Sequence, residues 1–305
     1  MRAFITGATG FVGSRLCHKL LSEGIEVTAL IRKEETKNIL PSAVTLIQGK
    51  PMEAGSWYDP VADCDIAINL AGSPIFTRWN DQSKRQIRQS RVFTTRSLAD
   101  ALVKHRAGKK TVLISASATG FYGSTGQNLV DEDTPAGSGF LSETAQVWEA
   151  EAMAASSAGV KVVITRFGVV LGKNGGALAA MLPAFKLNLG SPLGDGHQWF
   201  PWIHIEDLLE IFMFIIRNDE IEGPINCTSP SAVTNDEFSH ALASALDKYY
   251  FLPPVPEFII RLAFGEVSSV VLQGQRTTPR KLLAAGFTFK YAGIDGALKD
   301  IVGGK

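Results

Sequence analysis

The sequence has few cysteines, and they are scattered along the chain. Its 305 residues include only Cys17, Cys64 and Cys227, with no CxxC or CxxH pair among them. Neither a disulfide framework nor a zinc site is indicated, and no metal is expected. We expect these side chains to be small buried groups in a reducing compartment.

Long apolar runs and an excess of either charge are also missing. Gly7 and Gly10 interrupt the first apolar stretch before it reaches signal-peptide length, and the run Ile211 to Ile216 is far too short to cross a bilayer. The 30 Lys and Arg residues balance 30 Asp and Glu residues. We therefore expect a cytoplasmic protein with no nucleic-acid and no membrane partner.

The sequence does contain enough apolar residues, 45% of the total, for a large core. Apolar, β-branched segments predict strands at Arg2–Thr6, Glu26–Ile31, Val44–Ile47, Ile66–Leu70, Thr111–Ile114 and Val160–Ile164. Helical spacing predicts helices at Phe11–Glu23, Asp81–Lys104, Leu141–Ser157 and Glu206–Arg217. Apolar strands that alternate with helices are typical of a parallel sheet covered on both faces, so we predict a doubly wound α/β (Rossmann) fold.

The alternation weakens after Arg166, where Gly and Pro become frequent up to Pro201. We therefore predict a dinucleotide-binding core over residues 1–170, whose domain extends to about 220. A smaller C-terminal substrate lobe is expected over residues 171–305.

A glycine-rich turn connects the first strand to the first helix. Gly7, Gly10 and Gly13 have the spacing GxxGxxG. Such glycines permit a tight turn and the approach of a pyrophosphate to the backbone, and the helix N-terminus attracts the anion. The alternative is a turn with no ligand. The pattern predicts a dinucleotide site that includes Gly7, Thr9, Gly10, Phe11, Val12 and Gly13.

The end of the second strand indicates which dinucleotide binds. Arg32 and Lys33 follow Ile31, and the nearest acidic residues, Glu34 and Glu35, lie further along. An acidic residue here binds the ribose 2′-OH of NAD, whereas an arginine accommodates the 2′-phosphate of NADP. We favour NADP(H) over NAD(H), with Arg32 as the phosphate ligand. The alternative is that Arg32 and Lys33 are solvated surface charges.

Several motifs resemble those of the extended short-chain dehydrogenase/reductases, the nucleotide-sugar epimerase and dehydratase superfamily. They are the glycine turn, Asn69–Gly72, Ser115–Gly123, Arg166–Gly172 and Trp202–Asp207. A narrower set resembles an atypical "epimerase family protein" group, also called cell-division-inhibitor-like: Arg78-Trp79, Gly175–Ala177, Pro192–Gly196, Phe200–His204 and Gln275-Arg276. That group has a C-terminal domain of unknown function, here at about 255–302. The resemblance implies further cofactor residues, namely Leu70, Ala71, Gly72, Ser115 and Arg166.

The resemblance also shows what is missing. Members of the superfamily transfer a proton with a Tyr and a Lys at Y-x-x-x-K spacing on the helix after the fifth strand. When Glu149 is matched to the family's glutamate, Leu141 and Ala145 occupy these two positions. Neither side chain can donate or accept a proton. No Tyr occurs between Tyr122 and Tyr249, so a small shift of the alignment does not restore the pair.

Ser117 and Tyr122 are the best remaining catalytic candidates, because they follow the fifth strand near the expected nicotinamide position. The alternative for Tyr122 is a phenol packed at the sheet edge with its OH bonded to the backbone. Glu143 is a second acid–base candidate, and its alternative is a solvated helix residue.

Four residues are candidates for holding a substrate, and two others share their chemistry. The four are Trp79, Trp202, His204 and Arg276, and the two are Trp199 and Arg280. Tryptophan rings stack on ligands or fill core, and arginines clamp an anion or lie at the surface. His204 titrates near neutral pH, or holds the lobe against the dinucleotide domain while Asp207 caps the next helix.

These features lead to two hypotheses. The first is an NADP(H)-dependent oxidoreductase or epimerase-like enzyme for an unidentified small polar substrate, with its proton from Tyr122, water or the substrate. The second is a non-catalytic NADPH-binding sensor or regulator, which the loss of Tyr and Lys favours. The helix at residues 81–104 helps to build a dimer interface in many relatives. It is strongly charged here, so we expect a monomer or weak homodimer.

Overall fold

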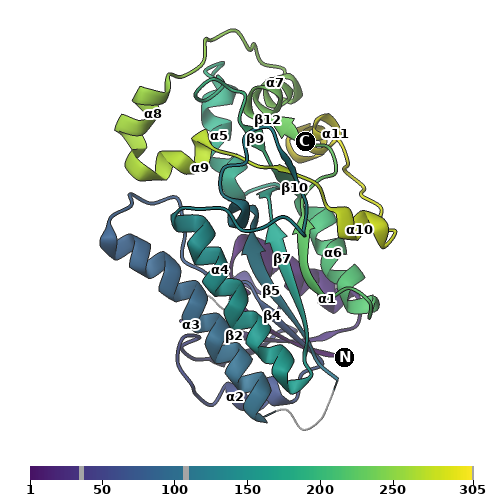
Figure 1. Ribbon diagram of the computed structural model, residues 1–305. Helices are drawn as coiled ribbons and strands as arrows, with labels where there is room; N and C mark the ends of the chain where they lie inside the picture. Colours follow the sequence, from purple (N-terminus) through teal and green to yellow (C-terminus); the bar gives the residue numbers. More distant parts are fainter. Residues whose placement is uncertain (34–37, 106–109, 304–305) are drawn as a thin grey trace.

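A parallel sheet forms the core of the protein, shown by a computed structural model that describes residues 1–33, 38–105 and 110–303. The strands are β1 (Arg2–Thr6), β2 (Glu26–Ile31), β3 (Thr45–Gln48), β4 (Ile66–Asn69), β5 (Val112–Ala118), β7 (Lys161–Phe167) and β11 (Gly223–Cys227). They form one seven-stranded sheet in the order β11-β7-β5-β4-β1-β2-β3, and every pairing is parallel (Figure 1). The predicted doubly wound α/β fold is confirmed.

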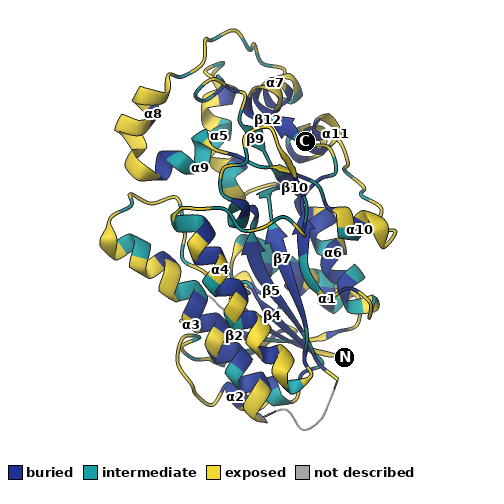
Figure 2. Cartoon of the chain, viewed as in Figure 1, coloured by how far each residue is buried: buried dark blue, intermediate teal, exposed yellow. Residues whose placement is uncertain are grey.

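Helices cover both faces of the sheet because alternate residues of each strand are apolar on opposite sides. One face carries α1 (Phe11–Ser22) and α6 (Ile205–Arg217), and the other carries α2 (Tyr58–Ala62), α3 (Asp81–His105) and α4 (Phe140–Met153). In β1, Ile5 packs in the first core with Leu16 and Phe212. Its neighbour Phe4 packs in the second core with Leu98. Figure 2 shows the resulting buried strands.

A smaller lobe lies beyond the carboxyl ends of the strands (Figure 1). Its elements are β8 (Val169–Leu171), α5 (Gly176–Lys186), β9 (Trp199–Phe200), β10 (Trp202–His204), β12 (Val233–Thr234), α7 (Asn235–Ala245), α8 (Glu257–Phe264), α9 (Ser269–Leu272), β13 (Arg276–Thr277) and α11 (Ile294–Gly303). Leu178, Trp202, Phe238 and Leu298 share one buried core there. The helix α10 (Arg280–Ala284) packs on β11, and its Leu282 lies in the core of the sheet domain. Of the residues of α8, only Ile260 is buried, and the helix is largely exposed (Figure 2). The short strand β6 (Leu129–Val130) pairs with β13 and joins the lobe to the sheet domain.

The strand order reverses between β1 and β4, because the chain runs outward from β1 through β2 and β3 and then returns to the other side of β1. In doubly wound sheets, the crevice at the carboxyl ends of two such strands is the usual ligand site. Thr6 and Asn69 end β1 and β4 and pair in register across this point.

Sequence analysis missed the seventh strand, β11. Because β11 and α6 belong to the sheet domain, the core of the lobe is assembled from separate segments, residues 169–202, 233–250 and 291–302. The helix expected to reach Ser157 ends as α4 at Met153 and continues as a 3₁₀ turn, Ala154–Ala158.

Cys17, Cys64 and Cys227 are all free and buried, as predicted. Burial raises the pKa of both Cys17 and Cys64 to about 12. Among the described residues, no helix combines the length and apolar character that a membrane span requires.

Candidate functional site

The turn after β1 is built so that glycines approach other backbone closely. Gly7 has a positive φ of 75°, and a Cβ on it would lie 2.5 Å from the carbonyl carbon of Leu70. A Cβ on Gly13 would overlap the carbonyl oxygen of Gly7. By contrast, Gly10 is exposed, and an added Cβ would meet only the Gly7 oxygen, at 3.3 Å. The turn therefore leaves open space at Gly10, where the fingerprint predicts a phosphate.

The first turn of α1 offers free backbone donors at this place. Gly10 is the N-cap residue and has no side chain to accept from the helix, and the first turn contains no acidic residue. Phe11 opens the helix, with the Arg15 guanidinium 4.2 Å from its ring centroid. Thr9 and Val12, on either side of Gly10 and Phe11 in the sequence, are half-buried. Helix N-termini of this kind bind anions.

A buried network fixes the end of β4 against its neighbours. The Thr6 hydroxyl donates to Asn69 Oδ1 at 2.7 Å, and Asn69 Nδ2 donates to Thr95 Oγ1 at 2.6 Å and to Ser115 Oγ at 3.4 Å. Leu70, Ala71 and Gly72 follow directly and are not buried. Ser115, predicted as a cofactor ligand, lies inside β5 with 1% of its surface exposed, so its hydroxyl supports Asn69 instead.

Arg32 lies at the same edge of the sheet. It follows β2, whose Leu30 pairs with Thr6 of β1, and its side chain is exposed. Within the described part of the chain, Arg32 makes no ion pair or hydrogen bond, so its charge is available to a ligand. Glu34 and Glu35, which entered the choice of cofactor, lie outside the described residues.

Arg166 belongs to a buried cluster rather than to an open site. Its Nε and Nη2 donate to the two oxygens of Glu149 at 2.9 and 2.8 Å, and Ser117 Oγ donates to the same carboxylate at 2.5 Å. The Phe121 ring lies 3.5 Å from the guanidinium carbon. The structure therefore corrects two predictions: Arg166 and Ser117 are 3% and 2% exposed and are committed to Glu149.

Tyr122 completes this cluster. Its OH donates to Asn226 Oδ1 at 2.7 Å and accepts from Arg166 Nη1 at 3.0 Å. Burial raises the pKa of Tyr122 to about 12, although Arg166 acts in the opposite direction. A phenol bonded on both sides, with a pKa this far above neutrality, is poorly suited to proton transfer. The geometry favours the alternative that Tyr122 is a structural residue at the sheet edge, except that its OH bonds to side chains and not to the backbone. The second candidate, Glu143, is exposed on α4.

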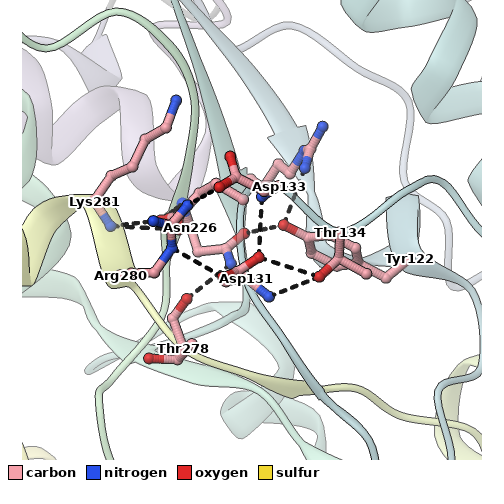
Figure 3. A network of polar contacts seen from close by, with 10 residues as sticks. Tyr122, Asp131, Asp133, Thr134, Asn226, Thr278, Arg280 and Lys281 are labelled. Atoms are coloured by element: carbon pink, nitrogen blue, oxygen red, sulfur yellow. Dashed lines mark hydrogen bonds and ion pairs between the residues drawn. The ribbon is translucent and has the colours of Figure 1, made fainter.

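The same hydrogen bonds continue into the C-terminal segment (Figure 3). Asn226 of β11 donates from Nδ2 to the Thr278 carbonyl at 2.9 Å and from its backbone to Glu132 at 3.0 Å. Arg280 pairs with Asp131 at 2.9 Å and also with Asp133 (Figure 3). Arg280 is therefore already neutralised by two carboxylates, which removes it as an anion clamp.

Trp202 and His204, both predicted as substrate ligands, are each 1% exposed. The Trp202 ring fills the lobe core, and its Nε1 donates to the Ser231 carbonyl at 3.2 Å. His204 is the N-cap of α6, since its Nδ1 accepts from the Glu206 backbone at 3.2 Å. Burial is the main cause that lowers the pKa of His204. Both residues therefore act in the fold, which corrects their predicted role.

Asp207, expected to cap α6, instead ties the sheet domain to the C-terminal segment. Its carboxylate accepts from the backbone N–H groups of Lys290 and Tyr291 at 2.8 and 2.9 Å. The Tyr291 ring lies on His204, with 3.8 Å between ring centroids. The alternative interpretation of this segment, that it holds the lobe against the dinucleotide domain, agrees with these contacts.

Trp79 and Arg276 are the two substrate candidates that remain accessible. Trp79 is half-buried, and its Nε1 donates to the Ile75 carbonyl at 2.9 Å. Arg276 is exposed in β13, with its guanidinium carbon 4.7 Å from the Trp199 ring centroid. Among the described residues, Arg276 forms no ion pair with a carboxylate.

Sequence reasoning missed the roles of Glu149 and Asn226. A signal for the first was present, because an arginine on a buried strand such as Arg166 needs an acidic partner. Nothing in the sequence pointed to the role of Asn226, because it lies 104 positions after Tyr122, the residue that it contacts.

The parallel sheet with its glycine turn and open α1 N-terminus defines a Rossmann-type α/β protein. Residues 3–227 match the NAD dependent epimerase/dehydratase family, and residues 255–301 match a domain of unknown function, DUF1731. The chain therefore belongs to the NAD dependent epimerase/dehydratase family.

Similar proteins match nearly the whole length of this chain. The epimerase family protein SDR39U1 homolog, chloroplastic, of Arabidopsis thaliana is 38% identical over 308 residues, which cover 99% of this chain and 87% of the relative. Epimerase family protein YfhF of Bacillus subtilis is 36% identical, covering 99% and 98%. The crystal structure of human epimerase family protein SDR39U1 (isoform 2) with NADPH has a TM-score of 0.86 at 34% identity, covering 99% of each chain. This chain is thus similar to the SDR39U1-type proteins, an atypical extended group.

Proposed function

We propose that this chain binds NADP(H) at the carboxyl ends of β1, β2 and β4, and acts as an epimerase- or reductase-like protein on a small polar substrate. The observation that carries this proposal is the open N-terminus of α1 at Gly10, with Arg32 exposed at the end of the neighbouring strand β2. The NADPH in the human relative's crystal structure supports the choice of cofactor.

The residues present fit such a ligand. The backbone N–H groups of Phe11, Val12 and Gly13 would bind the pyrophosphate, and Arg32 would bind the 2′-phosphate. Leu70, Ala71 and Gly72 would line the opposite wall. When bound, NADPH would supply a hydride at the nicotinamide end of this crevice.

The proton requires another source than a side-chain dyad. Leu141 and Ala145 carry no ionisable group, and both hydrogen-bonding directions of the Tyr122 hydroxyl are occupied. We therefore propose water or the substrate itself as the proton source. Trp79 and Arg276 are the proposed substrate contacts because they stay accessible.

The second candidate, a non-catalytic NADPH-binding sensor or regulator, is favoured by the same loss of proton-transfer groups at Leu141 and Ala145. Both candidates require a bound dinucleotide, and they differ in turnover. Oxidation of NADPH, followed at its absorbance maximum with a panel of small polar carbonyl compounds, distinguishes them. Consumption that Arg32→Ala slows at limiting NADPH identifies the enzyme.

The test of the shared claim is a calorimetric titration of Gly10→Ala with NADPH. Gly10 has φ −77°, which alanine adopts freely, so the variant should fold. Its methyl group would occupy the phosphate space, and we expect NADPH affinity to fall at least about tenfold. Gly293→Ala is the matched control, because a Cβ there meets nothing within 4 Å. A folded Gly10→Ala protein that binds NADPH as tightly as the wild type would contradict the proposal.

A further inference from the structure

Arg91 on α3 is a partly buried cation without a carboxylate. Its Nη1 donates to the carbonyl oxygens of Ser73 and Ile87 at 3.0 and 3.1 Å. Within residues 1–33, 38–105 and 110–303, its Nε–H and Nη2–H groups have no acceptor. Burial lowers the pKa of Arg91 to about 10, and no anionic group acts against this effect. The charge is retained at neutral pH, and within the described residues no carboxylate compensates its burial.

The free side of this guanidinium is suited to a specific kind of partner. In Arg166, the Nε and Nη2 groups together hold both oxygens of Glu149. Among the described residues, the same two groups of Arg91 make no hydrogen bond. Arginine uses this edge to bind carboxylate or phosphate oxygens in pairs.

Arg91 also lies where the dinucleotide is proposed to bind. A Cβ on Gly72 would be 3.1 Å from the guanidinium carbon and 3.3 Å from Nη2 of Arg91. Gly72 follows Leu70 and Ala71, and a Cβ on Gly7 of the glycine turn would lie 2.5 Å from the Leu70 carbonyl carbon and 2.7 Å from the Ala71 nitrogen. The segment Leu70–Gly72 therefore lies against the glycine turn at one end and near Arg91 at the other.

Two neighbouring groups on α4 also lack partners. The Trp148 ring centroid is 5.3 Å from the Arg91 guanidinium carbon, and its buried Nε1 has no hydrogen-bond partner in the described structure. The hydroxyl of Thr144, one turn earlier, is likewise buried and unpartnered among the described residues. Native proteins rarely leave buried donors unsatisfied. These donors indicate a ligand that supplies acceptors.

Arg91 lies beside the part of α4 where the superfamily has a lysine and this chain has none. Ala145, which stands where the superfamily has its lysine, lies between Thr144 and Trp148 on the same helix. Helices α3 and α4 run side by side on one face of the sheet (Figure 1). The positive charge beside α4 is therefore the Arg91 guanidinium of α3, and not a lysine of α4 itself.

We propose that Arg91 and Trp148 bind an anionic oxygen group of a ligand, and that Arg91 replaces the ammonium of the missing lysine. The oxygen group is a phosphate of the dinucleotide or a phosphate or carboxylate of the substrate. The proposal rests on the dinucleotide site described above.

The test compares Arg91→Met with Arg88→Met, which removes an exposed arginine from the same helix. Calorimetric titrations use NADPH and NADH on each protein, and inorganic phosphate on each NADPH-loaded protein. If the dinucleotide supplies the oxygen, Arg91→Met weakens NADPH and NADH alike by at least about tenfold. If the substrate supplies it, dinucleotide affinity is kept, and phosphate binding seen in the wild type and in Arg88→Met is lost in Arg91→Met.

Stability separates a binding role from a structural one. Arg91 has no carboxylate partner that its removal would leave behind, so the urea midpoint of Arg91→Met should equal or exceed that of the wild type. In the Arg91→Met background, Ala145→Lys should recover part of the lost affinity.

Unchanged affinities for NADPH, NADH and phosphate in Arg91→Met would overturn this inference and leave the proposed function intact. A wild-type protein that binds neither dinucleotide would instead overturn the proposed function, and this inference with it.

Discussion

Arg166 and Glu149 form a two-point ion pair, with Nε to Oε1 at 2.9 Å and Nη2 to Oε2 at 2.8 Å. Their side chains are only 4% and 11% exposed. Because Ser117 donates to the same carboxylate, the pair joins β5, β7 and α4 at the carboxyl edge of the sheet. The helix that carries the proton-transfer dyad in the superfamily is thus anchored here by a buried charge pair.

We predict that Glu149→Ala lowers the free energy of unfolding by about 3–5 kcal/mol, because it leaves the Arg166 charge buried and unpaired. Urea denaturation measures this loss. Glu151→Ala is the control, since its partner Arg96 is exposed, and we expect a cost of about 0–1 kcal/mol. Similar losses in the two variants would contradict the assigned role of Glu149.

Tyr122→Phe should destabilise the protein while leaving its ligand chemistry unchanged. The substitution removes the donor to Asn226 Oδ1 and the acceptor for Arg166 Nη1, at a cost of about 1–3 kcal/mol. Urea denaturation and an NADPH titration check both parts. Normal stability together with abolished turnover would show instead that Tyr122 is the proton donor.

Acid should destabilise the protein through His204. Burial lowers the pKa of this imidazole from its ordinary 6.5, although Glu206, Asp300 and Asp207 act in the opposite direction. Below pH 6.5 the unfolded chain therefore takes up a proton that the folded chain does not. The free energy of unfolding then falls as the pH falls from that value through the folded-state pKa.

His204→Asn tests this pH dependence, since asparagine keeps an acceptor for the Glu206 N–H but does not titrate. We expect a less stable protein near about pH 7.5, with a smaller further loss on acidification to about pH 5. Urea midpoints at several pH values give both quantities. His18→Asn, at an exposed position on α1, should retain the wild-type dependence. An unchanged pH slope in His204→Asn would rule out this group as the cause.

Local patterns in the sequence account for most of the fold. The strands β1 to β5 and β7 and the helices α1, α3, α4 and α6 follow from short apolar runs and helical spacing. The segment Gly223–Cys227 has no such signal, because it contains Gly, Pro and Asn, and it becomes a strand only by pairing with β7. Tertiary pairing outweighs local preference there.

In the candidate site, too, local sequence features could be predicted, whereas roles set by tertiary contacts could not. The glycine turn and Arg32 are local features, and their positions agree with the expected crevice. For Tyr122, Trp202 and His204 the sequence left a ligand contact and a structural role open, and burial and distant partners decide between them. Arg91 gave no sequence signal, since its importance depends on the absence of a carboxylate around it.

The most direct measurement is a pair of calorimetric titrations, with NADPH and with NADH, on the nucleotide-free wild type and on Arg32→Ala. The account predicts that the wild type binds NADPH at least about tenfold more tightly, equivalent to about 1.4 kcal/mol, and that Arg32→Ala removes this preference without weakening NADH. Failure of the wild type to bind either nucleotide, or a preference for NADPH that persists in Arg32→Ala, would contradict it.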